Sequence, residues 1–173
     1  INSNLGAKDD LIEKLIAASH DISYVELYTS CEATGSAAEY IRDGMIWRQW
    51  IDNCARIAEQ GNFKKFHVMA TINGLCLTSI IDFLDMIMIS KENYGKDWPT
   101  VTLNILRFPS FQSPLVLPDS IRFDYCCKLQ RWYDDHADSE FLHEYERNQL
   151  QRLIDYLNTV KTPHADAAEQ AIL

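Results

Sequence analysis

The sequence predicts an α/β fold, a parallel-sheet partial barrel (half-barrel) of about four βα units followed by C-terminal helices. Segments with a strand pattern alternate with segments of helical periodicity, and this order is typical of right-handed βαβ units that build a parallel sheet. About four strands are too few to close an eight-stranded barrel, so the sheet should stay open. With 173 residues, 47% of them hydrophobic, the chain is long enough to bury one core.

The first part of the chain supplies the predicted elements in alternation. Residues 1–4 have the composition of a strand end, and the apolar residues of 8–20 recur with the 3.6-residue period of a helix. Residues 22–29 are rich in Val, Tyr, Leu and Ile and are predicted to form a strand. Residues 37–59 are predicted to be helical in two pieces, with a break near Gly44.

The second part continues the same alternation. A loop at residues 109–118 is punctuated by proline and is predicted to contain no helix. The predicted strands are 65–72 and 101–108, and the predicted helices are 77–90, 118–135 and 139–160.

Composition and charge exclude several classes of function. A formal net charge of -9 argues against a nucleic-acid partner, because phosphate binding needs a basic face. No apolar run approaches the ~20 residues of a transmembrane helix, and no signal-peptide pattern stands at the start of the sequence. The 5 cysteines follow no disulfide or zinc spacing, so we expect reduced thiols and a cytoplasmic protein.

Three loops that follow predicted strands are expected to meet at one rim of the sheet. They are residues 30–35, 73–74 and 108–113. The loops beyond the C-terminal ends of parallel strands lie at a common edge, and functional residues of α/β proteins gather there. We therefore expect the ligand-binding residues of this chain in these loops.

The first of these loops carries residue types that suit a ribose or a carboxylate ligand. The Ser30 hydroxyl and the Glu32 carboxylate offer the donor and acceptors that ribose hydroxyls need, and the Arg42 guanidinium suits a carboxylate. The alternative is an ordinary polar loop in which Arg42 pairs on the surface with Asp43 or Glu39. Spacing alone favours this alternative, because loops are polar by default.

Other conspicuous residues have simpler structural interpretations. Asn73 with Gly74 favours a turn, with ligand orientation as the alternative. Cys76 is predicted to be a buried structural thiol rather than a reactive thiolate at the start of a helix. We expect His67 to be a hydrogen-bonded strand residue, and Cys126 and Cys127 to be one core and one surface residue.

Two clusters of aromatic and histidine residues are also assigned structural roles. Trp47, Trp50 and Tyr40 are predicted to belong to the core rather than to a ligand cage. His136 and His143 have acidic neighbours but match no standard zinc spacing, so helix capping is favoured over a metal site. The residues identify no metal ligands and no catalytic residue.

Taken in order, the strand ends resemble the middle and second half of the barrel in radical S-adenosylmethionine (radical SAM) proteins, especially those with a short twitch auxiliary domain. The most specific piece is EATGSAAEYIRDG, residues 32–44, and the order and spacing of the other pieces support it. The matching residues are Ser3-Asn4-Leu5, Ser30-Cys31-Glu32-Ala33, Glu39-Tyr40-Ile41-Arg42-Asp43-Gly44 with Trp47 or Trp50 and Asn53, Thr71-Ile72-Asn73, and Asn104 through Pro109 to Leu117-Pro118. The resemblance covers residues 1–125, and residues 126–173 are assigned as C-terminal helices of the same globular unit.

The resemblance implies a cofactor-binding role for five residues. It places Ser30 and Arg42 in contact with SAM, and it places Glu32 at the position of the family's acidic residue, where Glu stands for the usual Asp. Asn4 would face SAM or the substrate, and Asn73 would lie at the next turn of the same rim.

The family's Cys-x3-Cys-x2-Cys motif, whose thiolates hold a [4Fe–4S] cluster, is absent from the sequence. The chain begins at Ile1 rather than Met, and a helical pattern runs through residues 164–173 to its end. We therefore expect part of a longer radical SAM oxidoreductase or transferase that uses SAM and a [4Fe–4S] cluster. This chain alone is expected to hold neither cofactor and to be inactive; a non-enzymatic α/β interaction domain is the alternative.

The expected partners follow from the same interpretation. The longer protein would act on a small molecule or a peptide, and neither nucleic acid nor a membrane is expected as a partner. A half-barrel leaves an edge and a face of its sheet exposed. We therefore expect a homodimer formed through that edge or face.

Overall fold

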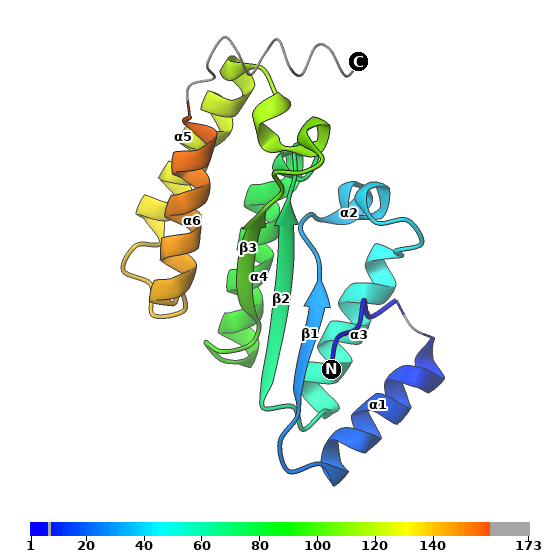
Figure 1. Ribbon diagram of the computed structural model, residues 1–173. Coiled ribbons are helices and arrows are strands. Elements are labelled where there is room, and N and C mark those ends of the chain that lie inside the picture. The colour runs from blue at the N-terminus through cyan, green and yellow to red at the C-terminus, as the bar shows by residue number, and fades with distance from the viewer. Residues whose placement is uncertain (7, 160–173) are drawn as a thin grey trace.

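The computed structural model describes residues 1–6 and 8–159, and within them a three-stranded parallel sheet is combined with six α-helices (Figure 1). The strands are β1 (Glu26–Ser30), β2 (Lys65–Ile72) and β3 (Thr100–Ile105). The helices are α1 (Asp9–Asp21), α2 (Gly35–Ile41), α3 (Trp47–Gln60), α4 (Ile80–Tyr94), α5 (Asp119–Asp135) and α6 (Glu144–Leu157). The predicted boundary between the half-barrel (residues 1–125) and the C-terminal helices (residues 126–173) falls within α5.

The strands lie in the order β1-β2-β3, and both pairs are parallel. On the far side of β1, Asn2 forms an isolated parallel bridge with Tyr28, where the Ser3 N–H donates to the Tyr28 carbonyl at 2.9 Å. The predicted α/β class with a parallel sheet is therefore confirmed. The predicted strand at residues 1–4 is present only as this single bridge, because only residues 1–3 run alongside β1.

The two faces of the sheet are covered differently. The α3 and α4 helices cover one face, where the Trp50 indole N–H donates to the Thr29 hydroxyl at 3.3 Å inside the core. The other face carries the half-buried Tyr28 and His67, whose ring centroids lie 5.4 Å apart. In Figure 1 no described helix crosses in front of β1 or β2. Along β2 the residues on the helix-covered face are fully buried: Phe66, Val68, Ala70 and Ile72.

The free edge of β3 is sealed by side chains of α6. Glu146 Oε1 accepts the Val101 N–H at 2.9 Å, and Gln149 Oε1 accepts the Leu103 N–H at 2.5 Å. Arg152 Nη2 donates to the Leu103 carbonyl at 2.7 Å. These α6 residues are three positions apart, so they share one helix face and follow the strand edge.

A buried ion pair joins α4 to α6. Lys91 Nζ lies 2.5 Å from Glu146 Oε2 and donates to the Phe141 carbonyl at 2.8 Å, and both charged side chains are almost fully buried. Burial lowers the pKa of the Lys91 ammonium, and the Glu146 carboxylate opposes this shift. The pair fixes the position of α6 against β3.

Several element boundaries differ from those predicted. β3 ends at Ile105 rather than at residue 108, and α4 spans Ile80–Tyr94 rather than residues 77–90. The last helix begins at Glu144 rather than at 139–140, because the His143 N–H donates to Glu146 Oε2 at 2.9 Å and caps the helix there. The strand predicted from residue 22, which is β1, begins at Glu26. The predicted absence of helix from the loop 109–118 is wrong for two short 3₁₀ turns, Ser110–Gln112 and Pro114–Val116. Residue 160 and the helical pattern of 164–173 lie outside the described residues.

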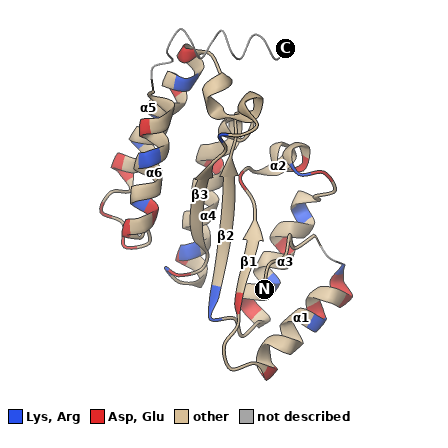
Figure 2. Cartoon of the chain, viewed as in Figure 1, with Lys and Arg blue, Asp and Glu red and all other residues tan. Residues whose placement is uncertain are grey.

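Charged residues lie mainly on the helices, as Figure 2 shows, with one acidic and one basic residue at the amino ends of β1 and β2. These are Glu26 and Lys65, which form an ion pair at 3.2 Å. Among the described residues, no helix combines the length and the apolar composition that crossing a membrane requires.

Candidate functional site

A cavity of about 710 Å³ opens at the carboxyl ends of the three strands. It is lined after β1 by Glu32 and Arg42, after β2 by Asn73 and Leu75, and after β3 by Phe111 and Gln112. The Gly74 N–H donates to the Gln112 carbonyl at 3.0 Å and ties the second loop to the third. The loops that we expected to share a rim therefore do so.

An ion pair between Glu32 and Arg42 forms one wall of this cavity. Arg42 Nε and Nη2 lie 3.0 and 2.5 Å from Glu32 Oε2, and Glu32 is only 3% exposed. The expected surface pair of Arg42 with Asp43 or Glu39 is therefore wrong. A buried carboxylate needs a charged partner, and Arg42 supplies it. Glu39 instead accepts the Trp47 N–H at 2.8 Å and caps α3.

The pair leaves Arg42 available to a ligand. Burial raises the pKa of the Glu32 carboxyl, and the Arg42 guanidinium opposes that rise. Within the described residues Arg42 Nη1 has no hydrogen-bond partner, and the side chain is 28% exposed. A guanidinium held by a buried carboxylate has a fixed orientation, so its remaining donors point in a defined direction for an incoming anion.

Asn73 lines the cavity, but its amide oxygen serves the turn that starts the next helix. Asn73 Oδ1 accepts the N–H of Leu75 at 2.9 Å and of Cys76 at 3.1 Å. Its Nδ2 contacts the Thr71 carbonyl at 3.4 Å. The predicted turn is confirmed, and the amide NH₂ is the part of Asn73 that is left for a ligand.

Ser30 and Asn4 do not line the cavity. Ser30 ends β1 and is half-buried beside Met69, and its hydroxyl has no hydrogen bond within the described part of the chain. Asn4 is exposed, and its Oδ1 accepts the Gly6 N–H at 3.1 Å in a local turn. Of the five predicted binding residues, the structure thus gathers Glu32, Arg42 and Asn73 around one cavity.

Exposed apolar side chains around the cavity were not expected. Tyr40 is 79% exposed, Phe111 61% and Leu75 56%, and all three line the cavity. The prediction that Tyr40 belongs to the core with Trp47 and Trp50 is wrong for Tyr40. The sequence feature that separates Tyr40 from the two tryptophans is the break after α2. Gly44 there has φ +78, so Tyr40 lies on a different helix from the stacked Trp47 and Trp50.

Two cysteines near the rim have structural roles. Cys31 and Cys76 are buried, and burial raises the pKa of each thiol to about 12. Their Sγ atoms contact the carbonyls of Ala33 at 3.2 Å and of Asn73 at 3.1 Å. The predicted buried role of Cys76 is confirmed, as is the division of the adjacent pair, where Cys126 is buried and Cys127 is exposed.

Three of the histidines, His67, His136 and His143, make structural contacts. His67 Nδ1 and Nε2 each lie 2.6 Å from a threonine hydroxyl, those of Thr100 and Thr102, so the predicted hydrogen-bonded role is confirmed. His143 caps α6, and His136 stacks on Trp132 at the end of α5. The described residues contain no group of three or more His, Cys, Asp or Glu side chains placed to hold a metal ion. They therefore do not fit a [4Fe–4S] cluster.

Comparison with protein-family models, with curated proteins and with solved structures gave no match to this chain.

Proposed function

We propose that this chain is the later part of a radical SAM half-barrel of about four βα units, and that its rim cavity binds S-adenosylmethionine. The observation that carries the proposal is the convergence of three strand-end loops on one cavity with a buried carboxylate–guanidinium pair in its wall. In open α/β sheets, ligands bind beyond the carboxyl ends of the strands. The segments that meet at this cavity include the one most similar to the radical SAM family, residues 32–44.

The cavity has the volume and the groups that SAM requires. Ligand pockets of about 300–1,000 Å³ are typical for molecules of this size, and this one measures about 710 Å³. Arg42 would hold the carboxylate of SAM, and the exposed ring of Tyr40 offers a stacking surface for adenine. Bound SAM would supply the 5′-deoxyadenosyl group for radical chemistry in the longer protein.

The segment with the Cys-x3-Cys-x2-Cys motif, which would hold the [4Fe–4S] cluster, would have to come from another part of the longer protein. The described residues do not fit a [4Fe–4S] cluster, so no reaction step is assigned to this chain. Its residues position and orient SAM, and the proposal predicts no catalytic turnover by the chain alone.

Calorimetric titration with SAM and with S-adenosylhomocysteine tests the proposal. We expect saturable binding of both compounds, and Tyr40→Ala should weaken it at least about fivefold through loss of one base–aromatic stack. The matched control is Phe123→Ala, which removes an aromatic ring 62% exposed on α5, away from the cavity. Tyr40 is exposed, so its truncation should leave the fold intact.

Two results would contradict the proposal. The first is the absence of saturable SAM binding at millimolar concentration, and the second is equal binding by the Tyr40→Ala and Phe123→Ala variants. Reading the codons that precede Ile1 gives an independent test. An open frame containing Cys-x3-Cys-x2-Cys supports the radical SAM assignment, and a nearby start codon without that motif argues against it.

One observation favours the alternative of a non-enzymatic interaction domain. The rim exposes several apolar side chains, among them Phe108, which is 86% exposed. Apolar patches of this kind mark surfaces that bind partners. A chain that binds no SAM but associates through this rim, with loss of association in Phe108→Ser, would favour the interaction domain.

A further inference from the structure

A second cavity, of about 430 Å³, lies on the helix-covered side of the sheet, between α3 and α4. It shares no lining residue with the rim cavity. On α3 its wall combines the larger Trp50 and Ile51 with the small side chains Cys54, Ala55 and Ala58, which leave an open channel between the two helices. A mainly apolar cavity of this size with a few polar side chains is typical of sites that bind small molecules.

One end of the channel is aromatic. Phe66 and Trp98 lie with ring centroids 5.4 Å apart at the amino edge of the sheet, and Tyr94 at the end of α4 completes this end. Phe66 is buried and Trp98 half-buried, so their rings are held by the core rather than by a ligand. This end suits an aliphatic chain or an apolar ring.

The other end is acidic. Asp82, which is exposed, and Asp85, which is half-buried, lie in the first two turns of α4 and line the channel, as does Trp50. Asp85 Oδ1 accepts the Trp132 indole N–H at 2.7 Å, and within the described residues Asp82 has no hydrogen bond or ion pair. No Lys, Arg or His is among the described residues that line the channel.

The two ends are well separated along the helix. From Asp82 to Tyr94, α4 advances about 18 Å at 1.5 Å per residue. The two carboxylates at one end attract a cation, whereas no charged side chain lines the aromatic end, where the Tyr94 hydroxyl donates to Glu59 Oε1 at 3.1 Å. The channel is thus complementary to an elongated molecule with one cationic head and one apolar tail.

We propose that the channel between α3 and α4 binds an amphiphilic amine, with its ammonium group at Asp82 and Asp85 and its apolar chain against Ala58, Phe66 and Trp98. The site is independent of SAM binding at the rim.

Three probes with one common chain test the head-group preference: n-octylammonium, n-octanoate and 1-octanol, titrated calorimetrically into the full chain. We expect octylammonium to bind at least about tenfold more tightly than octanoate, with octanol between them, because opposite charges attract and like charges repel at the acidic end. Equal affinity for octylammonium and octanoate overturns the proposal.

Two variants test the location of the head group. Asp82→Asn with Asp85→Asn should reduce the preference for octylammonium over octanoate to about threefold or less, because both charges are removed. The new amide oxygen at position 85 can still accept the Trp132 indole N–H, so the fold should be kept. The control with the same change of net charge is Glu92→Gln with Glu140→Gln, both exposed and outside the channel. A preference that survives in the first variant, or falls equally in the control, overturns the proposal.

Two further variants test the location of the chain. Ala58→Trp should fill the channel and weaken all three probes at least about tenfold, and Ala18→Trp on the exposed face of α1 is the control. Ile89 lines the channel and is 56% exposed, so Ile89→Lys should fold normally and selectively weaken octylammonium. Probe binding that is unaffected by both channel variants overturns the proposal. A homodimer that Ala58→Trp dissociates also overturns it, by assigning the channel to a second copy of the chain.

Discussion

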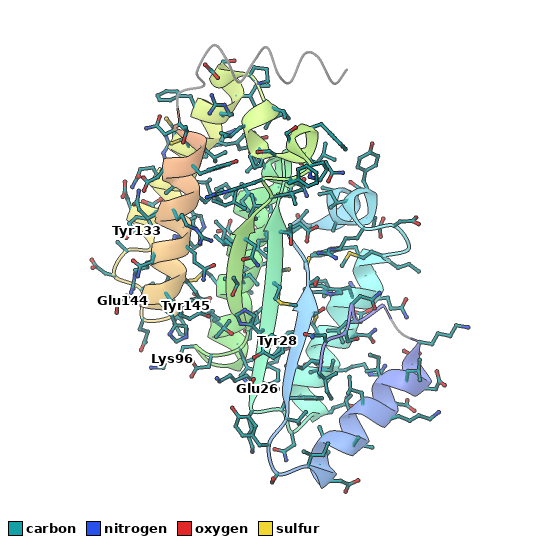
Figure 3. All side chains as sticks on the ribbon, in the orientation of Figure 1. Glu26, Tyr28, Lys96, Tyr133, Glu144 and Tyr145 are labelled. Atoms are coloured by element: carbon teal, nitrogen blue, oxygen red, sulfur yellow. The ribbon has the colours of Figure 1, made fainter. Side chains whose placement is uncertain are left out.

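Glu26, at the start of β1, shows how single side chains of this protein accept several hydrogen bonds. Its carboxylate accepts from the Tyr24 hydroxyl at 2.6 Å and the Tyr28 hydroxyl at 2.7 Å, and it pairs with Lys65 at 3.2 Å. Figure 3 labels Glu26 and Tyr28 on β1. The hydrogen bond from Tyr24, then that from Tyr28, lowers the pKa of Glu26 from 4.5 to about 2. The charged form is therefore the one that the folded state favours.

Acid stability should depend on this carboxylate. Because the pKa of Glu26 is lower in the folded state, its stabilising contribution is complete above pH 4.5 and is lost as the pH falls towards about 2. Glu26→Gln should therefore lower the urea midpoint at pH 7 and flatten its decline between about pH 5 and 2. Urea unfolding followed by circular dichroism at several pH values measures this. An unchanged slope, or the same change in Glu92→Gln, would contradict the prediction.

At the residue scale, the sequence predicted the role of a side chain correctly where residue type and local pattern largely determine its burial or hydrogen bonding. Cys76, Cys126 and His67 have the structural roles that residue type and pattern predicted. The partner of Arg42 was not predictable, because it depends on the burial of Glu32, ten residues earlier in the loop that follows β1. Burial of a carboxylate is a tertiary property, and local spacing does not report it.

At the scale of elements, α6 takes the place of a further strand beside β3. Unpaired N–H and C=O groups on a sheet edge invite pairing with another chain. Here Glu146, Gln149 and Arg152 provide hydrogen bonds to the exposed edge groups of Val101 and Leu103. The helix therefore both ends the sheet on this side and protects it from association.

Removing one of these side chains should loosen the edge locally. Gln149→Leu keeps the side-chain volume but leaves the Leu103 N–H without an acceptor, which should cost about 1–3 kcal/mol of unfolding free energy. Native-state hydrogen exchange should show the Leu103 amide exchanging at least about fivefold faster. Gln151→Leu, on a different face of α6, is the control. Unchanged exchange at Leu103 would mean that α6 does not protect this edge.

The buried pair between α4 and α6 should be sensitive to loss of one partner. Lys91→Met leaves the Glu146 carboxylate buried without its counter-ion, which should lower the free energy of unfolding by about 3–5 kcal/mol. Adding Glu146→Gln removes the uncompensated charge while an amide oxygen can still accept the Val101 N–H, so it should recover part of that loss. Urea unfolding of both variants measures the difference. A double variant less stable than Lys91→Met alone would contradict this explanation.

Element boundaries were predictable where a local signal sets them. The bounds of β2 and the range of α5 match the sequence analysis, because alternating burial defines β2 and Pro118 precedes α5. The start of α6 was missed, since His143 is an uncommon capping residue and Glu146 is held there by Lys91 from another helix. Tertiary contacts thus decide this boundary.

At the scale of the whole molecule, the two ends of the sheet differ. The β3 end is covered by α6, whereas the other end is the segment of residues 1–3 beside β1. Ile1 and Ser3 use their backbone groups to bond Tyr28, so the N–H and C=O of Asn2 point away from β1. Among the described residues neither group of Asn2 has a hydrogen-bond partner, and Asn2 is exposed. The fold class could be predicted from the order of strands and helices in the sequence. The difference between the two sheet ends could not, because it depends on where α6 packs, and helical periodicity does not indicate the packing partner of a helix.

The predicted homodimer should therefore form through the edge at Asn2. Asn2→Pro removes the outward N–H but none of the bonds to β1, and proline is tolerated on strand edges. Sedimentation velocity over a range of concentrations should show a monomer–dimer equilibrium for the natural chain and a monomer for Asn2→Pro at equal thermal stability. Asn2→Ala, which keeps the N–H, should still dimerise. If the unsubstituted chain stays monomeric, the predicted homodimer is contradicted. If the dimer is lost in Phe108→Ser but kept in Asn2→Pro, the contact lies at the apolar rim, because Phe108→Ser alters the rim and Asn2→Pro does not.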